Sequence, residues 1–397
     1  MYPTLVTKST VYESNYEDDM FESVKILVAI PPSTRNIVLV GRANDIEVRI
    51  VSKVNGRLHN DKTYKAIAQD VNDEEMVSRT RGMVNAAEMD SKGIAWVVFE
   101  CYDKLTWSLR RRQLGGTFGP TTPIDLLRYI LTKTMLADRL SKKDHGYSIN
   151  YHGEEQKEWE SITIEEPTNF LDVADYIQNH YGIYSRGLGI FLFDRRWMIF
   201  RPYDPDKFSE AGKRLIIYNV PADEATSLER NFYTKGDLCY IAATGESTLE
   251  SSKTDMAVNE GTGVRFSDVR SLEYKMLSET VDGNERDPEL YLSEVNPNTS
   301  GLGSHAPIIK GGYSDNPRKL SSDLYRRKGR ILTLKWENGI TDCLEPGMGI
   351  QVIYPTSDGI GKVNGTLLAH TAYSEVIGNG FNEKVHGTVI SLVVMVF

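Results

Sequence analysis

Acidic side chains are the residues of this sequence that could most directly do chemistry, and many of them gather in one segment. Residues 147–166 carry the glutamates Glu154, Glu155, Glu158, Glu160, Glu165 and Glu166. Two carboxyl groups about 5–9.5 Å apart suffice to hydrolyse a glycosidic bond, and the catalytic acid needs burial or a charged neighbour to raise its pKa. So dense a polar run is typical of a solvated loop. A carboxylate-dependent hydrolase therefore stays open as an alternative.

Nucleophile, metal and phosphate chemistry leave no spacing signature in the chain. None of the seven histidines belongs to an HExxH motif or to a pair at positions i and i+4. Cys101, Cys239 and Cys343 form no CxxC pair, so we expect reduced, largely buried thiols and neither a zinc site nor a disulfide framework. The glycines of residues 115–119 depart from GxGxxG, and neither a P-loop nor a Gly-x-Ser-x-Gly elbow occurs. We therefore predict no enzyme, no cofactor and no metal.

The charge of the chain argues against a nucleic-acid-binding protein. The 397 residues carry a formal net charge of −9, whereas binding nucleic acid needs a basic face that displaces counterions. Arg110, Arg111 and Arg112 form a short basic cluster without interleaved aromatics. Such a cluster is typical of a solvated element end or of one side of an intersubunit salt bridge. No apolar stretch approaches the roughly 18–20 residues that span a bilayer, and no secretory signal is visible, so we expect no membrane insertion.

The first part of the chain predicts an N-terminal arm followed by a small β-barrel. Residues 1–22 are polar and end in acidic side chains, which favours a loosely held arm. Short strand-type runs follow, and residues 46–50 alternate apolar and polar side chains as a half-buried strand does. Asn55-Gly56 then provides the pair that a type I′ hairpin turn prefers. We interpret residues 23–109 as a first antiparallel β-barrel domain.

Residues 110–203 predict a compact α+β middle domain. Thr122 is a candidate N-cap, Pro123 suits the first helical position, and Asp125 can reach back as in a capping box. A second helix should end at Gly182, because glycine readily adopts the left-handed conformation that closes a helix. An aromatic-rich hairpin should follow it.

The last part of the chain predicts a second β-barrel domain made of two segments, 204–243 and 329–397. Residues 244–328 between them are polar and rich in Ser, Asn, Asp and Gly, so we interpret them as an insertion. Asn-Gly between strand-type runs is a strong hairpin signal, and Pro-Gly favours a tight turn. The predicted turns are Asn338-Gly339, Pro346-Gly347, Asn364-Gly365 and Asn379-Gly380. We thus predict a mainly β protein with two small antiparallel barrels bracketing a helix-containing α+β middle.

This layout resembles the baseplate hub protein of contractile-tailed bacteriophages, a family related to the hub region of type VI secretion spike proteins. Residues 96–105, a strand that continues into Tyr-Asp-Lys-Leu, look like the exit from that family's first barrel. Residues 169–203 are similar to its middle domain. Leu-Glu-Pro-Gly at 344–347, with the strands of 350–396, resembles its closing barrel. Residues 244–328 have no counterpart in it.

The resemblance implies a structural virion protein of the tail baseplate, assembled in the host bacterial cytoplasm. It implies a homotrimer whose two tail-tube-like barrels per subunit adapt a sixfold tail tube to a threefold spike. The implied partners are the tail tube protein, the central spike, and the wedge and tape-measure proteins. DNA would pass through the lumen without specific binding, and the net negative charge fits a conduit that repels it. The alternatives are a peptidoglycan-degrading tail enzyme with a carboxylate pair, or the hub region of a secretion-system spike or tail-tip protein.

Overall fold

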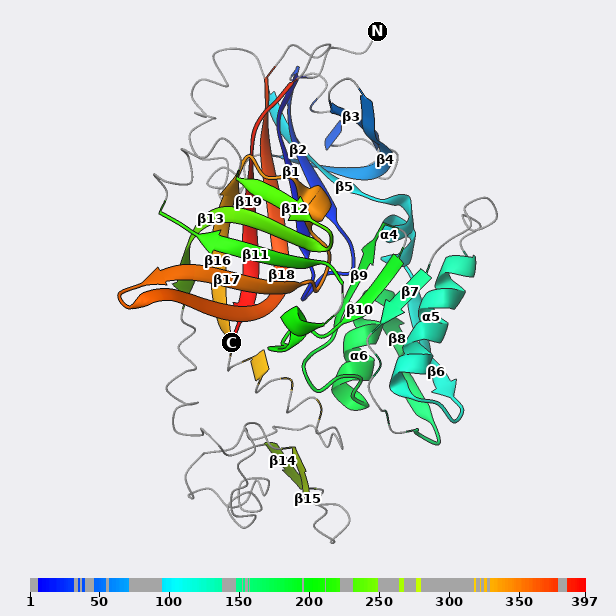
Figure 1. Ribbon diagram of the computed structural model, residues 1–397. Helices are drawn as coiled ribbons and strands as arrows, with labels where there is room; N and C mark the ends of the chain where they lie inside the picture. Colours follow the sequence, from blue (N-terminus) through cyan, green and yellow to red (C-terminus); the bar gives the residue numbers. More distant parts are fainter. Residues whose placement is uncertain are drawn as a thin grey trace, which may run out of the picture.

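The structure of the protein is a computed structural model. It describes residues 6–31, 46–54, 57–70, 95–137, 148–221, 231–248, 264–267, 276–279, 329–377 and 384–397, without 152, 154, 155, 157, 195 and 211, and in addition 35, 38, 39, 318, 322, 325 and 326. The described part of the chain is mainly β, with its helices gathered in the middle of the sequence (Figure 1).

The elements follow one another along the chain in a simple order. The strands up to the middle of the chain are β1 (Val6–Asn15), β2 (Ser23–Ile30), β3 (Glu47–Val54), β4 (Arg57–Asp70), β5 (Ala95–Tyr102), β6 (Gln113–Phe118), β7 (Ser148–Tyr151), β8 (Ile162–Asn169), β9 (Gly189–Phe193) and β10 (Arg196–Phe200). The later strands are β11 (Arg214–Asn219), β12 (Phe232–Lys235), β13 (Leu238–Thr248), β14 (Val264–Ser267), β15 (Met276–Glu279), β16 (Arg330–Glu337), β17 (Gly349–Thr356), β18 (Gly359–Ile377) and β19 (Lys384–Val396). The helices are α4 (Lys104–Leu109), α5 (Pro123–Ala137) and α6 (Val173–His180), with 3-10 turns η2 (Phe170–Asp172), η3 (Lys207–Ser209) and η5 (Thr341–Cys343).

Six strands close into a barrel. Hydrogen-bonded pairing runs in the order β17-β11-β13-β16-β19-β18 and returns from β18 to β17. These strands flank the long polar segment, and β13 extends to Thr248, beyond the boundary expected at residue 243. A short strand, β12, pairs with β13 outside this ring. Closing the ring pairs the backbone of each barrel strand with a neighbour on both sides.

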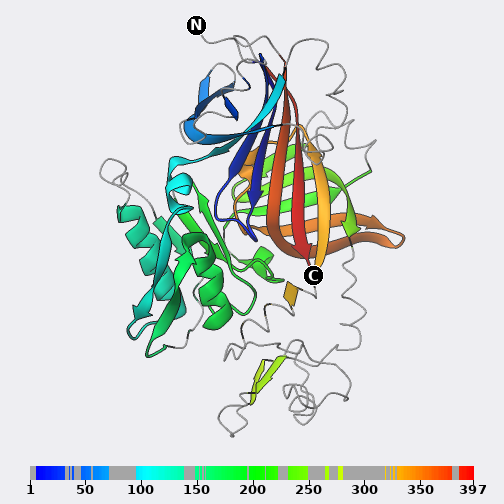
Figure 2. The same cartoon turned by 180° about the vertical axis from the view of Figure 1, so that it is seen from behind.

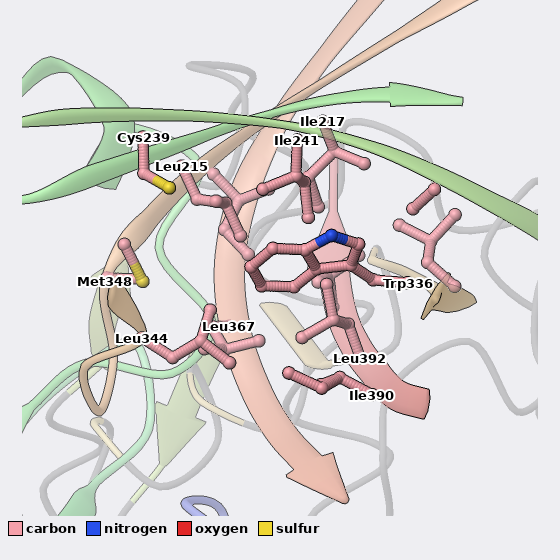
Figure 3. Close-up of a cluster of buried hydrophobic side chains, with 14 of the residues drawn as sticks. Leu215, Ile217, Cys239, Ile241, Trp336, Leu344, Met348, Leu367, Ile390 and Leu392 are labelled. Atoms are coloured by element: carbon pink, nitrogen blue, oxygen red, sulfur yellow. The ribbon is translucent and has the colours of Figure 1, made fainter. Parts of the chain in front are cut away.

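The barrel is filled by side chains that alternate inward along its strands. In β16, Leu334 and Trp336 are buried whereas Lys335 and Glu337 are exposed. Figure 3 shows the Trp336 indole enclosed by aliphatic side chains from several strands, among them Leu215, Ile217, Ile241, Leu367, Ile390 and Leu392. This packing is the driving force for closure, because each large apolar side chain that is fully buried contributes roughly 1.5–3 kcal/mol.

The long strand β18 joins the barrel to a second sheet. Its first residues pair with β17, and its residues 369–375 pair with β1, from which the sheet continues as β1-β2-β5-β4-β3. The prediction of a loose arm at residues 1–22 is therefore wrong for β1, which is held between β18 and β2. Its buried positions include Ser9 and Ser14, so it lacks the apolar alternation that would reveal a strand. Within the described residues this sheet is open at β3, and closure of the first barrel stays a prediction.

The middle part of the chain is an α+β unit, which confirms that aspect of the predicted fold class. β7, β10 and β9 form one small sheet, β6 pairs with β8, and α5 and α6 lie beside them (Figures 1 and 2). Thr122 Oγ1 accepts the Asp125 backbone N–H at 3.2 Å, so the predicted N-cap is confirmed. Gly182, with φ 77°, donates its N–H to the carbonyl of Ile177 and ends α6.

The predicted Asn-Gly and Pro-Gly turns differ in the local structure that they adopt. Pro346-Gly347 forms a turn before β17, with Gly347 at φ 64°. Asn338, at φ 53°, turns the chain at the end of β16, and Gly339 follows it. That turn closes no hairpin, because β16 pairs with β13 and β19 and not with β17.

The prediction of a turn at Asn364-Gly365 is wrong. Both residues lie inside β18, opposite Gln351 and Ile350 of β17. The β17–β18 hairpin instead turns at residues 357–358, since Thr356 pairs with Gly359. The prediction failed because glycine occurs not only in turns but also inside strands where two backbones approach closely.

Two further Asn-Gly pairs, Asn55-Gly56 and Asn379-Gly380, lie outside the described residues. The strands that they connect are antiparallel neighbours. Val54 of β3 stands opposite Arg57 of β4, and Ile377 of β18 stands opposite Lys384 of β19.

Candidate functional site

The most elaborate polar structure in the described residues is a junction where the N-terminal strand, the middle unit and the barrel meet. We use "the junction" for Tyr16, Glu17, Arg186, Arg201, Tyr203, Asp204 and His370. These residues come from the turn after β1, from the segments around β9 and β10, and from β18. The strands β9 and β10 lie next to the barrel in Figure 1, so the junction determines how the middle unit is held.

Tyr16, in the turn after β1, contacts both the barrel and the middle unit. Its N–H donates to the carbonyl of Leu368 in β18 at 2.8 Å. Its phenol oxygen lies 2.8 Å from Nδ1 of His370, a residue 354 positions away in the sequence. Its ring meets Phe191 of β9 edge-on, with the centroids 4.8 Å apart. One side chain thus ties β1, β9 and β18 together, and burial raises its pKa.

His370 is buried as the neutral base. Only 5% of its surface is exposed, and burial lowers its pKa to about 4. A neutral imidazole pairs with the Tyr16 hydroxyl without any buried net charge. Protonation would place a cation in a buried position beside Tyr16.

Acidification is therefore expected to destabilise the protein through His370. Because the pKa falls from 6.5 in the unfolded chain to about 4 in the fold, its contribution is complete above pH 6.5 and declines as the pH falls toward 4. Between pH 7.5 and pH 4.5 the loss should be about 2–3 kcal/mol. Urea unfolding at both pH values measures it. His370→Asn, which cannot be protonated, should lose that much less stability than the wild type over this interval, and equal losses would refute the role of His370.

Asp204 anchors the second half of the junction. Its side chain has no exposed surface and forms ion pairs with Arg186 and with Arg201, the latter at 2.5 Å. Its backbone carbonyl accepts the hydroxyl of Thr366 in β18 at 3.3 Å, which links it to the barrel. Arg186 also contacts Asp206 at 3.0 Å. A fully buried carboxylate is stable only with such compensation, because desolvation of an isolated charge is costly.

Tyr203 and Glu17 complete the junction. The Tyr203 hydroxyl donates to Glu17 Oε1 at 2.5 Å, and Arg326 Nε lies 3.1 Å from the same oxygen. Tyr203 is 7% exposed, and burial together with the charge of Glu17 raises its pKa. The Glu17–Tyr203 hydrogen bond thus connects the turn after β1 with the segment that follows β10.

The side chains of the junction hold three parts of the chain together. Its ionisable groups are engaged with one another, and the described residues contain no cluster of three or more metal-ligating side chains. In that same part of the chain, no helix is long and apolar enough to cross a membrane. From its contacts we interpret the junction as a structural connection between the turn after β1, the middle unit and the barrel.

The acidic run lies on the surface of the middle unit in its described members. Glu158, Glu160, Glu165 and Glu166 are exposed on the middle unit, whereas Glu154 and Glu155 lie outside the described residues. The described glutamates therefore lie in solvated positions, as the density of polar residues in this segment predicted.

The basic cluster has aromatic neighbours that its own sequence did not reveal. The Arg110 guanidinium lies over the Tyr102 ring at 4.2 Å, and that of Arg111 over the Trp107 ring at 5.0 Å. Arg112 donates to the carbonyl of Thr134 at 3.3 Å. Arg110 and Arg111 therefore cover aromatic residues at the two ends of this segment, and Arg112 links it to α5.

None of the predicted turn residues belongs to the junction, and sequence reasoning missed the residues that do. His370 lies in the strand-type run Leu-Leu-Ala-His-Thr-Ala-Tyr, and Asp204 lies in the polar sequence Arg-Pro-Tyr-Asp-Pro-Asp. A histidine at an inward position of a strand was the one available signal. Its partner could not be inferred, because it lies at the other end of the chain.

The fold has known counterparts, although no known family model and no curated protein matches the sequence. A tail protein from Neisseria meningitidis MC58 matches over 98% of this chain and 92% of its own, with 12% identity and a TM-score of 0.50. The chain has the fold of that tail protein. This confirms the predicted fold class, mainly β with an α+β middle.

Two further solved structures are similar at lower scores. The 43 kDa tail protein of prophage MuSo2 from Shewanella oneidensis matches over 98% of this chain and 96% of its own, at 9% identity and a TM-score of 0.44. The E. coli c3393 protein, described as a type VI secretion component with structural similarity to the T4 tail proteins gp27 and gp5, matches over 99% and 74%, at 8% identity and a TM-score of 0.44.

Proposed function

We propose that this protein is a structural component of a phage-type tail and forms the central hub of the baseplate as a homotrimer. The observation that carries the proposal is the shared fold with a tail protein over nearly the full length of both chains. The junction supports it, because a hub that carries load between a tube and a spike needs its parts held rigidly. The protein would then be located in the virion tail, after assembly in the host cytoplasm.

Exposed strand features fit an assembled state. The tip of the β17–β18 hairpin projects from the barrel in both views (Figures 1 and 2). Among the described pairings its residues 354–361 bond only with each other, and Ile360 is 73% exposed. On β12, Tyr233 is 60% exposed. Free strand edges and exposed apolar side chains are features that partner subunits commonly cover.

The partners that we propose are those of a hub. They are two further copies of the chain, the tail tube protein, a central spike, and the wedge and tape-measure proteins. The net charge of −9 fits a lumen through which DNA slides without binding. Two barrel-like regions per subunit would present six to a sixfold tube.

Mass determination in solution tests the proposal. We expect light scattering coupled to size exclusion to give three times the chain mass, and negative-stain images to show a ring, if necessary after co-expression with a spike protein. A strict monomer under both conditions would overturn the trimer. The likeness in fold would then point to a tail role without this assembly.

The hydrolase alternative can be tested directly at Glu22. Burial raises the pKa of Glu22, and the charge of Asp103 adds to the effect while Lys62 opposes it. We expect the protein to give no clearing in a peptidoglycan zymogram. Clearing that disappears in Glu22→Gln would show a carboxylate-dependent enzyme and contradict a purely structural role.

A further inference from the structure

Four residues shortly before β16 lie against the junction. We use "the strap" for Arg318, Ser322, Tyr325 and Arg326, which have helical backbone conformation. In a helix the spacing of Arg318, Ser322 and Tyr325 puts these three residues on one side. Ser322 is 5% exposed, so this side faces the protein. The strap leads into β16 through Gly329, whose N–H donates to the carbonyl of Tyr325 at 3.2 Å.

The strap is anchored on the middle unit at a peptide group that is itself held in place. Arg318 Nη1 donates to the backbone carbonyl of Ile183, which follows α6. Gln156 Nε2 donates to the same carbonyl at 2.8 Å, and Gln178 Oε1 accepts the Ile183 N–H at 2.8 Å. Because Ile183 is fixed from both sides, a bond from the strap to its carbonyl restrains the middle unit.

Tyr325 contacts both the middle unit and the barrel. The Arg186 guanidinium lies over its ring, 5.3 Å from the centroid. The Tyr325 side chain also packs against a buried cluster of Tyr203, Leu368 of β18 and Met395 of β19. A single aromatic side chain of the strap therefore lies where the middle unit meets two barrel strands.

Arg326 links the strap to the turn after β1 by opposite charge. Its Nε lies 3.1 Å from Glu17 Oε1, the oxygen that also accepts the Tyr203 hydroxyl. Residues 17–19 are all acidic, whereas residues 318–330 carry six Lys or Arg residues and one Asp. The Arg326 side chain is 52% exposed. Salt therefore screens this contact more than it affects the buried parts of the junction.

The strap is held more weakly than the barrel on which it lies. Of its four described residues, Tyr325 is the one that packs into an apolar cluster, and the ion pair of Arg326 is exposed. The barrel strands beside it are paired in a closed ring around a filled core. Regions with few buried apolar contacts open locally at a lower free energy than the whole protein unfolds. The strap is therefore expected to open before the barrel does.

We propose that the strap is a conformational device: closed, it holds the middle unit against the barrel, and it opens as one unit while the barrel stays folded. In the open state the middle unit keeps its direct bonds through Tyr16 and Asp204. It loses the contacts of Arg318 and Tyr325, and so can change its orientation relative to the barrel.

The position of the strap in the sequence gives this device a use. It forms the end of the polar segment 244–328, so a partner that binds this segment and displaces the strap would release the middle unit. The inference rests on the contacts of the strap and does not depend on the trimer or on the identity of the tail partners.

Hydrogen exchange of the full-length protein, followed by mass spectrometry in urea below the unfolding transition, tests the proposal. We expect the amides of residues 318–329 to exchange through an opening that leaves those of β16, β18 and β19 protected. Raising the NaCl concentration from about 0.05 M to about 0.5 M should speed the exchange of the strap and not that of the barrel strands, because only the strap depends on an exposed ion pair.

A substitution in the strap separates its opening from general damage. Tyr325→Ala removes the ring under Arg186 and its packing on the barrel, so it should speed the exchange of the strap amides by about tenfold. The Tyr203 amide, bonded to the Arg186 carbonyl at 3.0 Å, should also exchange faster, with β16, β18 and β19 unchanged. Tyr129→Ala is the matched control, because Tyr129 is an exposed tyrosine of the same unit with Lys133 5.3 Å from its ring centroid. It should leave the strap at the wild-type rate.

Two results would overturn the proposal. One is a wild-type protein whose strap amides exchange only together with those of the barrel strands, because the strap would then be a fixed part of the barrel. This result does not depend on whether a variant folds. The other is a Tyr325→Ala variant whose strap opens without faster exchange of the Tyr203 amide, because the strap would then not hold the middle unit.

Discussion

Replacement of Asp204 by alanine is expected to lower the free energy of unfolding by about 4 kcal/mol, since breaking a buried ion pair costs roughly 3–5 kcal/mol. The carboxylate is fully buried and faces both Arg186 and Arg201, which are themselves only 22% and 11% exposed. Without it, two guanidinium groups lose their shared counter-ion in a region of low dielectric. Arg201 keeps Glu210, and Arg186 keeps the exposed Asp206, so the loss is large without being total.

Urea unfolding of three variants separates this effect from general damage. Asp204→Asn keeps the volume and removes the charge, so it should lose nearly as much stability as Asp204→Ala. Asp206→Ala is the matched control, because this carboxylate contacts the same Arg186 but is 70% exposed. It should change stability by less than about 1 kcal/mol. If Asp204→Ala is no worse than Asp206→Ala, the junction does not hold the parts together.

The predictions that succeeded rest on local physics. The N-cap at Thr122 depends on a hydroxyl and an amide three residues apart. The hairpin of β9 and β10 depends on two short apolar runs and a polar turn, with Asp194 at φ 43°. Such signals are complete within a few residues, so the α+β middle could be predicted from the sequence.

The features that the sequence did not reveal depend on distant partners. β1 is a strand because β18 and β2 pair with its backbone on both sides, and its buried serines interrupt the apolar alternation by which a strand is predicted. Tyr16 and His370 meet across 354 positions. Residues that meet only in the folded protein have no characteristic spacing in the sequence, so no sequence pattern predicts their contact.

Gly365 was predicted to be required for a turn, but the structure indicates that it is required for close packing of two strands. As the second residue of an Asn-Gly turn it would need a positive φ, which asparagine also tolerates. In the fold it lies within β18, where a Cβ would stand 1.7 Å from the carbonyl oxygen of Met395 and 2.9 Å from Cα of Val396. The obstacle is backbone of β19, which no side-chain rotation can move. Any side chain at this position must therefore separate two paired strands of the closed barrel.

Gly365→Ala is consequently expected to destabilise the protein by about 3 kcal/mol or more, at the upper end of the overpacking range. Gly365→Asn should be at least as severe, whereas a turn glycine would accept asparagine. Gly387→Asn is the matched control in the neighbouring strand, because Gly387 has φ 59° with open space around its Cβ position. It should stay within about 0.5 kcal/mol of the wild type. Urea unfolding followed by far-UV circular dichroism distinguishes a turn glycine from a glycine required for close strand approach. A Gly365→Asn variant as stable as the wild type would support the turn and contradict the close approach. Destabilisation of both Gly365 variants, with Gly387→Asn unaffected, would support the close approach.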